Sequence, residues 1–326
     1  MTLEEKASLM SGKNFWETVD IERLGIPSML LADGPHGIRK QMKSADHLGL
    51  NESIKATCFP TAATMANSWN TDLVEVTAAA LGQEAAAQGV NVVLGPGINL
   101  KRNPLCGRNF EYFSEDPYLA GKMGAAVVRG IQQNGIAACV KHFAANNQEE
   151  RRMVIDSVVD ERTLRELYLT AFEIAIKEGH AKSIMTSYNK VNGIYANENP
   201  HLLKEILRDE WGFDGVVVTD WGGCNDRIEG LKAGNELEMP TTGGETNREI
   251  VEAVNTGRLD EAVLDAAVER LLTLIFDTDA ALKAGEHKFD EESHHMVAMQ
   301  AAEESVVLLK NINQTLPIPA GTRVAV

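Results

Sequence analysis

The chain has 326 residues, of which 44% are hydrophobic and 24% are charged, as in an ordinary soluble globular protein. Its formal charge of -16 would repel nucleic acid phosphates and anionic membrane surfaces, so both are disfavoured as partners and a neutral substrate fits better. The acidic, amphipathic start and the lack of a long apolar run predict a cytoplasmic protein without a targeting signal. The adjacent His294 and His295 would point to different faces, so we expect no metal site, and we expect no cofactor.

Short β-branched segments alternate with longer helical patterns along the chain. This alternation is typical of βα units around a parallel sheet or barrel. Seven or eight such units suit a (β/α)8 TIM-type barrel, which is the predicted fold. Strands are predicted over residues 28–33, 59–65, 90–95, 136–142, 183–188, 215–220 and 235–239.

Two helices between these strands carry clear start and stop signals. Asp160 can cap a helix whose apolar residues recur at helical spacing until Gly179. Asn199 can cap the next helix, Pro200 suits its first position, and Gly212 suits its end. This second helix leads the chain into the strand that ends at Asp220.

The C-terminal part changes character. The pattern is helical from 260 to about 276 and again near 293–304, while 305–310 and 322–326 look like strands on either side of a turn region. We therefore expect a catalytic barrel over 1–285. Residues 286–326 would be a linker and the first segment of an incomplete, truncated second α/β/α domain.

Polar residues gather where predicted strands end. In a barrel these ends share one face, and sites are built there because the following loops converge around a pocket. The sequence therefore predicts a site on this face. Its candidates are Asp33, Lys141, His142, Met185, Tyr188, Asp220 and Trp221.

Asp220 follows three valines and precedes Trp221 and two glycines. A carboxylate held by a rigid strand beside an aromatic plane suits nucleophilic attack on a sugar carbon, as in retaining glycosidases. The alternative is that Asp220 only caps the following helix.

Lys141, His142 and Arg108 are candidate ligands of sugar hydroxyls. Lys141 and His142 would present two donors to one site, although the lysine could instead form a Schiff base or a structural ion pair. Arg108 lies in a loop with aromatic and acidic residues, where it could clamp hydroxyls or hold the loop to its own acids.

Six motifs together resemble the N-terminal domain of glycoside hydrolase family 3, in its β-glucosidase branch. Both the amino-acid sequences of these motifs and the distances between them along the chain match that domain. They are TLEEKASLMSG at 2–12, ADGPHG at 32–37, GRNFEYFSEDP at 107–117, KHFAANNQEERR at 141–152, IMTSYNKVNG at 184–193 and VVTDWGG at 217–223.

The resemblance implies a retaining β-glycosidase that hydrolyses terminal non-reducing β-D-glucosyl residues through a covalent glycosyl-aspartate. It implies that Asp220 is the nucleophile and that Trp221 lines the sugar subsite. Asp33 rather than glutamate in its motif favours glucosides over pentosides. The other implied substrate-binding residues are Arg108, Lys141, His142 and Arg152, with Met185 and Tyr188 packing nearby.

The acid/base glutamate of this branch comes from a second domain, so the resemblance implies that it comes from a further domain of the same protein or a neighbouring chain. In the single-domain branch an Asp-His pair takes this role, but here Asp156 and Ser157 are followed by Val158. The chain by itself is therefore expected to be poorly active. The alternatives are a β-xylosidase or arabinosidase of the same family, a Schiff-base aldolase using Lys141, and a non-catalytic sugar-binding barrel fragment.

Overall fold

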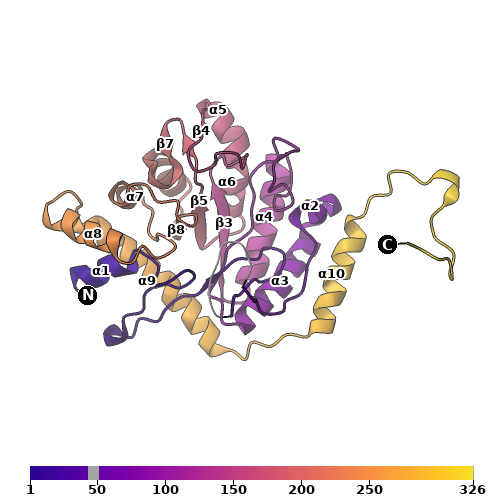
Figure 1. The fold of residues 1–326 in the computed structure, drawn as a ribbon, viewed down its shortest axis with the longest axis horizontal. Helices are drawn as coiled ribbons and strands as arrows, with labels where there is room; N and C mark the ends of the chain where they lie inside the picture. Colours follow the sequence, from indigo (N-terminus) through magenta and orange to yellow (C-terminus); the bar gives the residue numbers. More distant parts are fainter. Residues whose placement is uncertain (43–50, 326) are drawn as a thin grey trace.

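The computed structural model describes residues 1–42 and 51–325, and a parallel sheet lies at its centre with helices around it (Figure 1). The sheet order is β1-β2-β3-β5-β8, and every neighbouring pair is parallel. A smaller sheet, β4-β6-β7, lies apart from it. The strands are β1 (Leu31–Ala32), β2 (Val92–Val93), β3 (Ala137–Phe143), β4 (Asp156–Ser157), β5 (Ser183–Thr186), β6 (Lys190–Val191), β7 (Ile194–Tyr195) and β8 (Val216–Val218).

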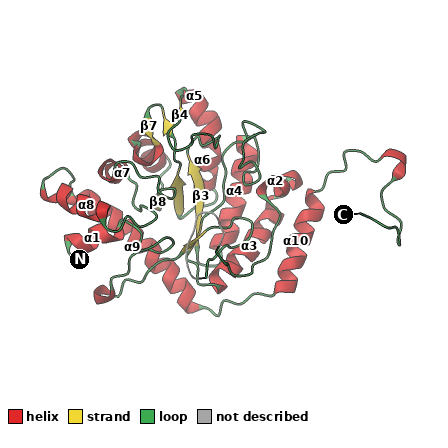
Figure 2. Ribbon diagram, in the orientation of Figure 1, coloured by secondary structure: helices red, strands yellow, loops and turns green. Residues whose placement is uncertain are grey.

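Figure 2 shows the strands enclosed by helices, some of which contain π-helical turns. The α-helices are α1 (Leu3–Leu9), α2 (Ala62–Met65), α3 (Thr71–Ala87), α4 (Pro117–Gln132), α5 (Glu161–Thr163), α6 (Thr170–Lys177), α7 (Arg227–Ala233), α8 (Glu245–Asn255), α9 (Glu261–Ala284) and α10 (Glu291–Ser305). The π-helical segments are Leu164–Leu169, between α5 and α6, and His201–Glu210. No helix in the described part of the chain has the length and low charge needed to span a bilayer.

Three irregular segments close the sheet into a ring. Beyond β8, Val218 bridges Leu237, and Glu238 in turn bridges Ser11. The chain then folds back through antiparallel bridges from Gly12 to Thr18 and from Glu17 to Leu30, next to β1. The predicted barrel is confirmed, with its opening strand replaced by a short reversed segment.

The core is layered on both sides of the strands. All seven residues of β3 are buried, as expected for a strand covered on both faces. Val93, Ala138 and Val217 pack with the outer helices α3, α4 and α6, whereas their strand neighbours Val92 and Ala137 belong to a second cluster with α1, α8 and α9.

The helix signals read from the sequence agree with the structure. The Asp160 carboxylate accepts a hydrogen bond from Thr163 N at 3.0 Å, and the Asn199 side chain accepts from His201 N at 3.0 Å. Gly212 has a φ of +72° at the end of the second helix, a conformation that glycine adopts readily.

Three strand predictions are wrong. Residues 62–65 form helix α2, and the valine and leucine run after Ser305 forms no strand in the described structure. The same holds for 322–325, while Val326 lies outside the described residues.

The two C-terminal helices also bear on the predictions. Helix α9 continues eight residues past the expected end at 276. Helix α10 packs against α3, where His294 Nδ1 lies 2.7 Å from Glu84 Oε1. The division into domains at 285 stays a prediction.

Candidate active site

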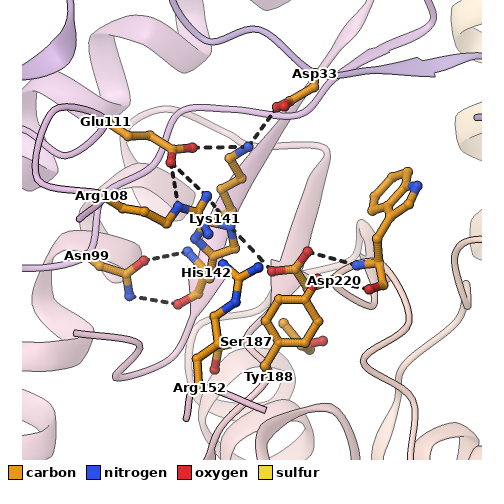
Figure 3. A network of polar contacts seen from close by, with 12 residues as sticks. Asp33, Asn99, Arg108, Glu111, Lys141, His142, Arg152, Ser187, Tyr188 and Asp220 are labelled. Atoms are coloured by element: carbon orange, nitrogen blue, oxygen red, sulfur yellow. Dashed lines mark hydrogen bonds and ion pairs between the residues drawn. The ribbon is translucent and has the colours of Figure 1, made fainter. Parts of the chain in front are cut away.

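One cavity of about 230 Å³ brings together all nine residues that the sequence predicts for the site. They come from the ends of β1, β3, β5 and β8 and from two loops. Figure 3 shows the polar groups of seven of them converging, namely Asp33, Arg108, Lys141, His142, Arg152, Tyr188 and Asp220. The residues that line the cavity are Trp16, Asp33, Arg39, Leu94, Arg108, Lys141, His142, Arg152, Met185, Tyr188, Asp220 and Trp221.

Lys141 lies near the end of β3 and is held by two carboxylates. Its Nζ is 3.1 Å from Asp33 Oδ1 and 3.2 Å from Glu111 Oε1. Burial opposes its positive charge, but these two carboxylates raise the pKa of Lys141 above its ordinary value. A Schiff base needs a neutral amine, so this geometry favours a charged hydrogen-bond donor over the aldolase alternative.

Asp33 directly follows β1 and opens a tight turn. Gly34 has a φ of +117°, and a Cβ there would lie 2.1 Å from the Gly37 carbonyl oxygen, so a side chain would not fit. The turn returns Arg39 to Asp33, with their side chains 3.5 Å apart. Burial by itself would raise the pKa of Asp33, but the Lys141 ammonium holds it below its ordinary value. Asp33 is therefore an ionised acceptor.

Arg108 pairs with an acid of its own loop and also faces the cavity, while its binding of sugar hydroxyls stays a prediction. Its Nη2 lies 2.7 Å from Glu111 Oε2 in the same loop, and its guanidinium also lines the cavity. Burial opposes ionisation of Glu111, but Lys141 and Arg108 lower its pKa below the ordinary value. The buried Glu111 thus bonds to both cations, and its link to Lys141 was not among the predictions from sequence.

His142 lies between Arg108 and Asp220. Its Nε2 is 3.1 Å from Arg108 Nη2 and 3.5 Å from Asp220 Oδ2. Burial lowers the pKa of His142 well below its ordinary value, and Arg108 and Lys141 lower it further. Because an arginine can only donate, Nε2 accepts from Arg108. This differs from the expected pair of donors at Lys141 and His142.

Asp220 is the second residue after β8, and its two carboxylate oxygens have different surroundings. Oδ1 accepts a hydrogen bond from Trp221 N at 2.8 Å, whereas Oδ2 is buried and accepts none from the described residues. Helix α7 is capped by Asp226 instead, which argues against the helix-capping alternative for Asp220. Burial raises the pKa of Asp220 above its ordinary value, and Arg108 and Lys141 oppose this rise.

Aromatic side chains form one wall of the cavity. Trp221 donates through Nε1 to the Phe15 carbonyl at 2.8 Å, and its ring lies 5.3 Å from that of Trp16. The Tyr188 hydroxyl donates to the Trp221 carbonyl at 2.9 Å, and the Arg152 guanidinium lies 4.8 Å from the Tyr188 ring centroid. These bonds fix aromatic faces at the cavity, where they can pack on the C–H side of a sugar ring.

Sequence reasoning missed Trp16, Arg39 and Leu94 among the cavity residues. Trp16 lies in an irregular N-terminal segment, and no periodic pattern marks it. Arg39 could have been found from the glycines of the turn after Asp33, since they predict a reversal of the chain. In the described part of the chain, no group of three or more histidine, cysteine, aspartate or glutamate side chains could hold a metal ion.

Several curated proteins are similar to this chain. Thermostable beta-glucosidase B of Acetivibrio thermocellus is 54% identical over 327 residues, which cover 100% of this chain and 43% of that protein. An exo-alpha-(1->6)-L-arabinopyranosidase of Bifidobacterium longum is 47% identical, covering 98% of this chain and 42% of that protein. The chain thus spans less than half the length of these relatives.

Solved structures and a family comparison agree with these relatives. The structure of beta-glucosidase 3B from Thermotoga neapolitana in complex with alpha-D-glucose has a TM-score of 0.91 at 42% identity, covering 98% of this chain and 47% of that one. A beta-glucosidase from Bifidobacterium adolescentis has a TM-score of 0.91 at 45% identity, covering 98% of this chain and 45% of that one. Residues 3–274 match the Glycosyl hydrolase family 3 N terminal domain, and the chain therefore belongs to this family.

Proposed function

We propose that this chain is the nucleophile-bearing barrel of a retaining β-glycosidase that hydrolyses terminal non-reducing β-D-glucosyl residues. The observation that carries the proposal is the Asp220 carboxylate, with one oxygen fixed by Trp221 N and the other without a hydrogen-bond partner among the described residues. Retaining glycosidases need a carboxylate of fixed geometry for this attack. The similarity to proteins named beta-glucosidases supports the same reaction.

In the first step, an Asp220 oxygen forms a bond to the anomeric carbon while the bond from that carbon to the leaving oxygen breaks. An acid donates a proton to the leaving oxygen, and the product is a glycosyl ester of Asp220. In the second step, a water molecule loses its proton to the conjugate base and attacks the same carbon. The ester bond breaks, and two inversions give net retention.

The size and polarity of the cavity suit one sugar unit. Its volume of about 230 Å³ is below the roughly 300–1,000 Å³ of typical small-molecule pockets. Asp33 can accept hydrogen bonds from sugar hydroxyls, while Lys141, Arg108 and Arg152 can donate to them. Such charge-assisted bonds are stronger than neutral ones and confer orientation.

The acid/base residue is proposed to come from outside the described barrel, in a second domain or a neighbouring chain. Among the described cavity residues, the carboxyl groups belong to Asp33 and Asp220. Lys141 keeps the pKa of Asp33 below its ordinary value despite burial, so it is a poor proton donor. The relatives also extend well beyond the matched region, since this chain covers 43% of the Acetivibrio protein.

The nucleophile can be tested by trapping. A β-glucoside with a fluorine at its second carbon and an activated leaving group should form a stable ester, and peptide mass spectrometry should locate it on Asp220. Addition of a nonfluorinated glucoside acceptor should release the label. An adduct on a different carboxylate would contradict the assignment.

The missing acid can be tested on this 326-residue chain. General acid catalysis contributes about 10²–10⁴-fold, and it matters most for leaving groups that need a proton. We therefore expect near-zero hydrolysis of cellobiose and slow but measurable release from a dinitrophenyl β-glucoside. Efficient cellobiose hydrolysis would place an acid/base within this chain or in a second copy of it.

A second candidate substrate is a pentopyranoside, because the chain is also 47% identical to a protein named exo-alpha-(1->6)-L-arabinopyranosidase. Comparing kcat/KM for aryl glucosides, xylosides and arabinopyranosides separates these candidates. A non-catalytic sugar-binding barrel would bind glucose but form no covalent adduct with the fluorinated glucoside.

A further inference from the structure

Tyr112 contacts the candidate site from behind the cavity. Its side chain is fully buried and does not line the cavity, yet its hydroxyl lies 3.2 Å from His142 Nδ1. The two rings meet edge to face, with their centroids 6.3 Å apart. A buried hydroxyl in this position can either donate to a ring nitrogen or accept from it, so the other side of the ring decides which happens.

Arg108 decides the protonation of the ring. Its Nη2 lies 3.1 Å from His142 Nε2, and a guanidinium carries donors and no acceptor. Nε2 must therefore carry a lone pair, which excludes both the doubly protonated ring and the tautomer with a proton on Nε2. The single proton is then on Nδ1, where it can be donated to the Tyr112 hydroxyl.

Asp220 is affected by this tautomer. The 3.5 Å contact between His142 Nε2 and Asp220 Oδ2 joins a lone pair to a carboxylate, so it is neither an ion pair nor a hydrogen bond. Oδ1 is held by Trp221 N at 2.8 Å, and Oδ2 keeps no partner among the described residues. A ring protonated at Nε2 would instead donate to Oδ2 and make the Asp220 carboxylate a weaker nucleophile.

We infer that Tyr112 is a positioning residue that accepts a hydrogen bond from His142 Nδ1 and so keeps Nε2 turned to Arg108 as an acceptor, leaving the Asp220 carboxylate without a hydrogen bond at Oδ2. This inference rests on the proposed function insofar as Asp220 is the nucleophile. Replacing the hydroxyl would leave the Nδ1 proton buried without a partner, an arrangement that disfavours this tautomer.

The tautomer can be measured without substrate. In the chain labelled with 15N-histidine, long-range 1H–15N spectra distinguish a protonated ring nitrogen from a bare one, and His142→Gln identifies the signals. We expect His142 to show a protonated Nδ1 and a bare Nε2 throughout pH 5–8. A proton on Nε2, or a ring that becomes doubly protonated within this range, would overturn the inference. The tautomer is measured on the unaltered chain, and His142→Gln serves only to assign its signals.

Tyr112→Phe then tests the role of the hydroxyl. We expect His142 to shift toward the Nε2-protonated tautomer, and labelling by the activated fluorinated glucoside to slow by about tenfold, the effect of one lost hydrogen bond. The matched control is Tyr118→Phe, six residues along the chain, whose ring is 62% exposed and packs with Lys122. An unchanged tautomer or labelling rate in Tyr112→Phe would overturn the inference.

The two proposals fail in distinguishable ways. A wrong tautomer together with an adduct on Asp220 overturns only the role of Tyr112. The expected tautomer together with an adduct on another carboxylate overturns the assignment of Asp220 as the nucleophile, and with it the effect of the tautomer on catalysis.

Discussion

Two apolar runs in this chain have opposite structural fates. Val216–Val218 forms strand β8, and each valine is at most 1% exposed. Residues 306–309, Val-Val-Leu-Leu, resemble it in sequence but are 60–90% exposed and form no strand. In Figure 1 the segment that follows α10 extends away from the helices.

Hydrogen-bonding neighbours explain the difference. β8 pairs in parallel with β5 from Ser183 to Met185, and Val218 also bridges Leu237. The described residues provide no such partner for 306–309. Apolar β-branched residues fit a half-buried pleated surface, but they do not create the neighbouring strand that makes the surface. An apolar run therefore predicts where a strand is possible, and the surrounding chain determines whether it forms.

The comparison also concerns function, because β8 holds Asp220 at its end. If strand β8 contributes to activity only by presenting the Asp220 carboxylate, Asp220→Asn should keep the fold and abolish glycoside hydrolysis. Loss of catalytic residues in covalent catalysis costs about 10⁴–10⁶-fold in kcat, so we expect a fall of at least about 10⁴-fold on an activated glucoside.

The matched control for this variant is Asp214→Asn at the opposite end of the same strand. Asp214 is exposed and does not line the cavity. We expect it to keep the activity of the unaltered chain, measured by release of dinitrophenolate. Similar losses in both variants would mean that the substitutions act through the strand rather than through the nucleophile.

Asp33 tests the opposite side of the same cavity. Asp33→Ala removes an ionised acceptor that also holds Lys141 at 3.1 Å, and each charged hydrogen bond contributes roughly 1.5–3 kcal/mol. We expect transition-state binding of glucosides to weaken by about 3 kcal/mol or more, measured as kcat/KM. Pentosides lack the sixth carbon and its hydroxyl, so they should lose less. Equal losses would indicate that Asp33 serves mainly to hold Lys141.

Two valine-to-alanine substitutions, one in each apolar run, test the comparison directly. Val217 is fully buried, so Val217→Ala should lower the free energy of unfolding by about 2 kcal/mol through lost contacts and a new cavity. Val307 is 60% exposed, so Val307→Ala should change it by less than about 0.5 kcal/mol. Urea unfolding of both variants gives the comparison. A large effect of Val307→Ala would show that the segment is packed in solution.

A further expected effect is a pH-dependent gain in stability in Asp220→Asn. Burial raises the pKa of Asp220 in the folded state, so its ionisation opposes folding above that pKa and has no effect below the unfolded-state pKa of about 3.9. The variant should therefore be more stable than the unaltered chain at pH 7, and the gain should vanish as the pH falls toward 4. Thermal unfolding across this range measures it. A gain that persists unchanged at low pH would have another cause.

The sequence by itself was sufficient to predict the alternation of strands and helices, the barrel, and the nine residues that meet in one cavity. The alternation and the barrel follow from local rules, whereas Arg152 was identified only through the motifs of the family. Helix caps such as Asp160 satisfy backbone groups a few residues away, and parallel strands place their C-terminal ends on one face. The motifs of the family then assigned roles to residues that the barrel gathers.

Only the tertiary structure decided which groups pair within the site and which apolar runs become strands. Glu111 connects Arg108 to Lys141, and Trp16 faces Trp221 across a separation of 205 residues in the chain, which no local pattern reveals. The acceptor role of His142 Nε2 depends on an arginine 34 residues away. Such choices depend on distances between remote segments, because hydrogen bonds and ion pairs act over a few ångströms once the chain has folded.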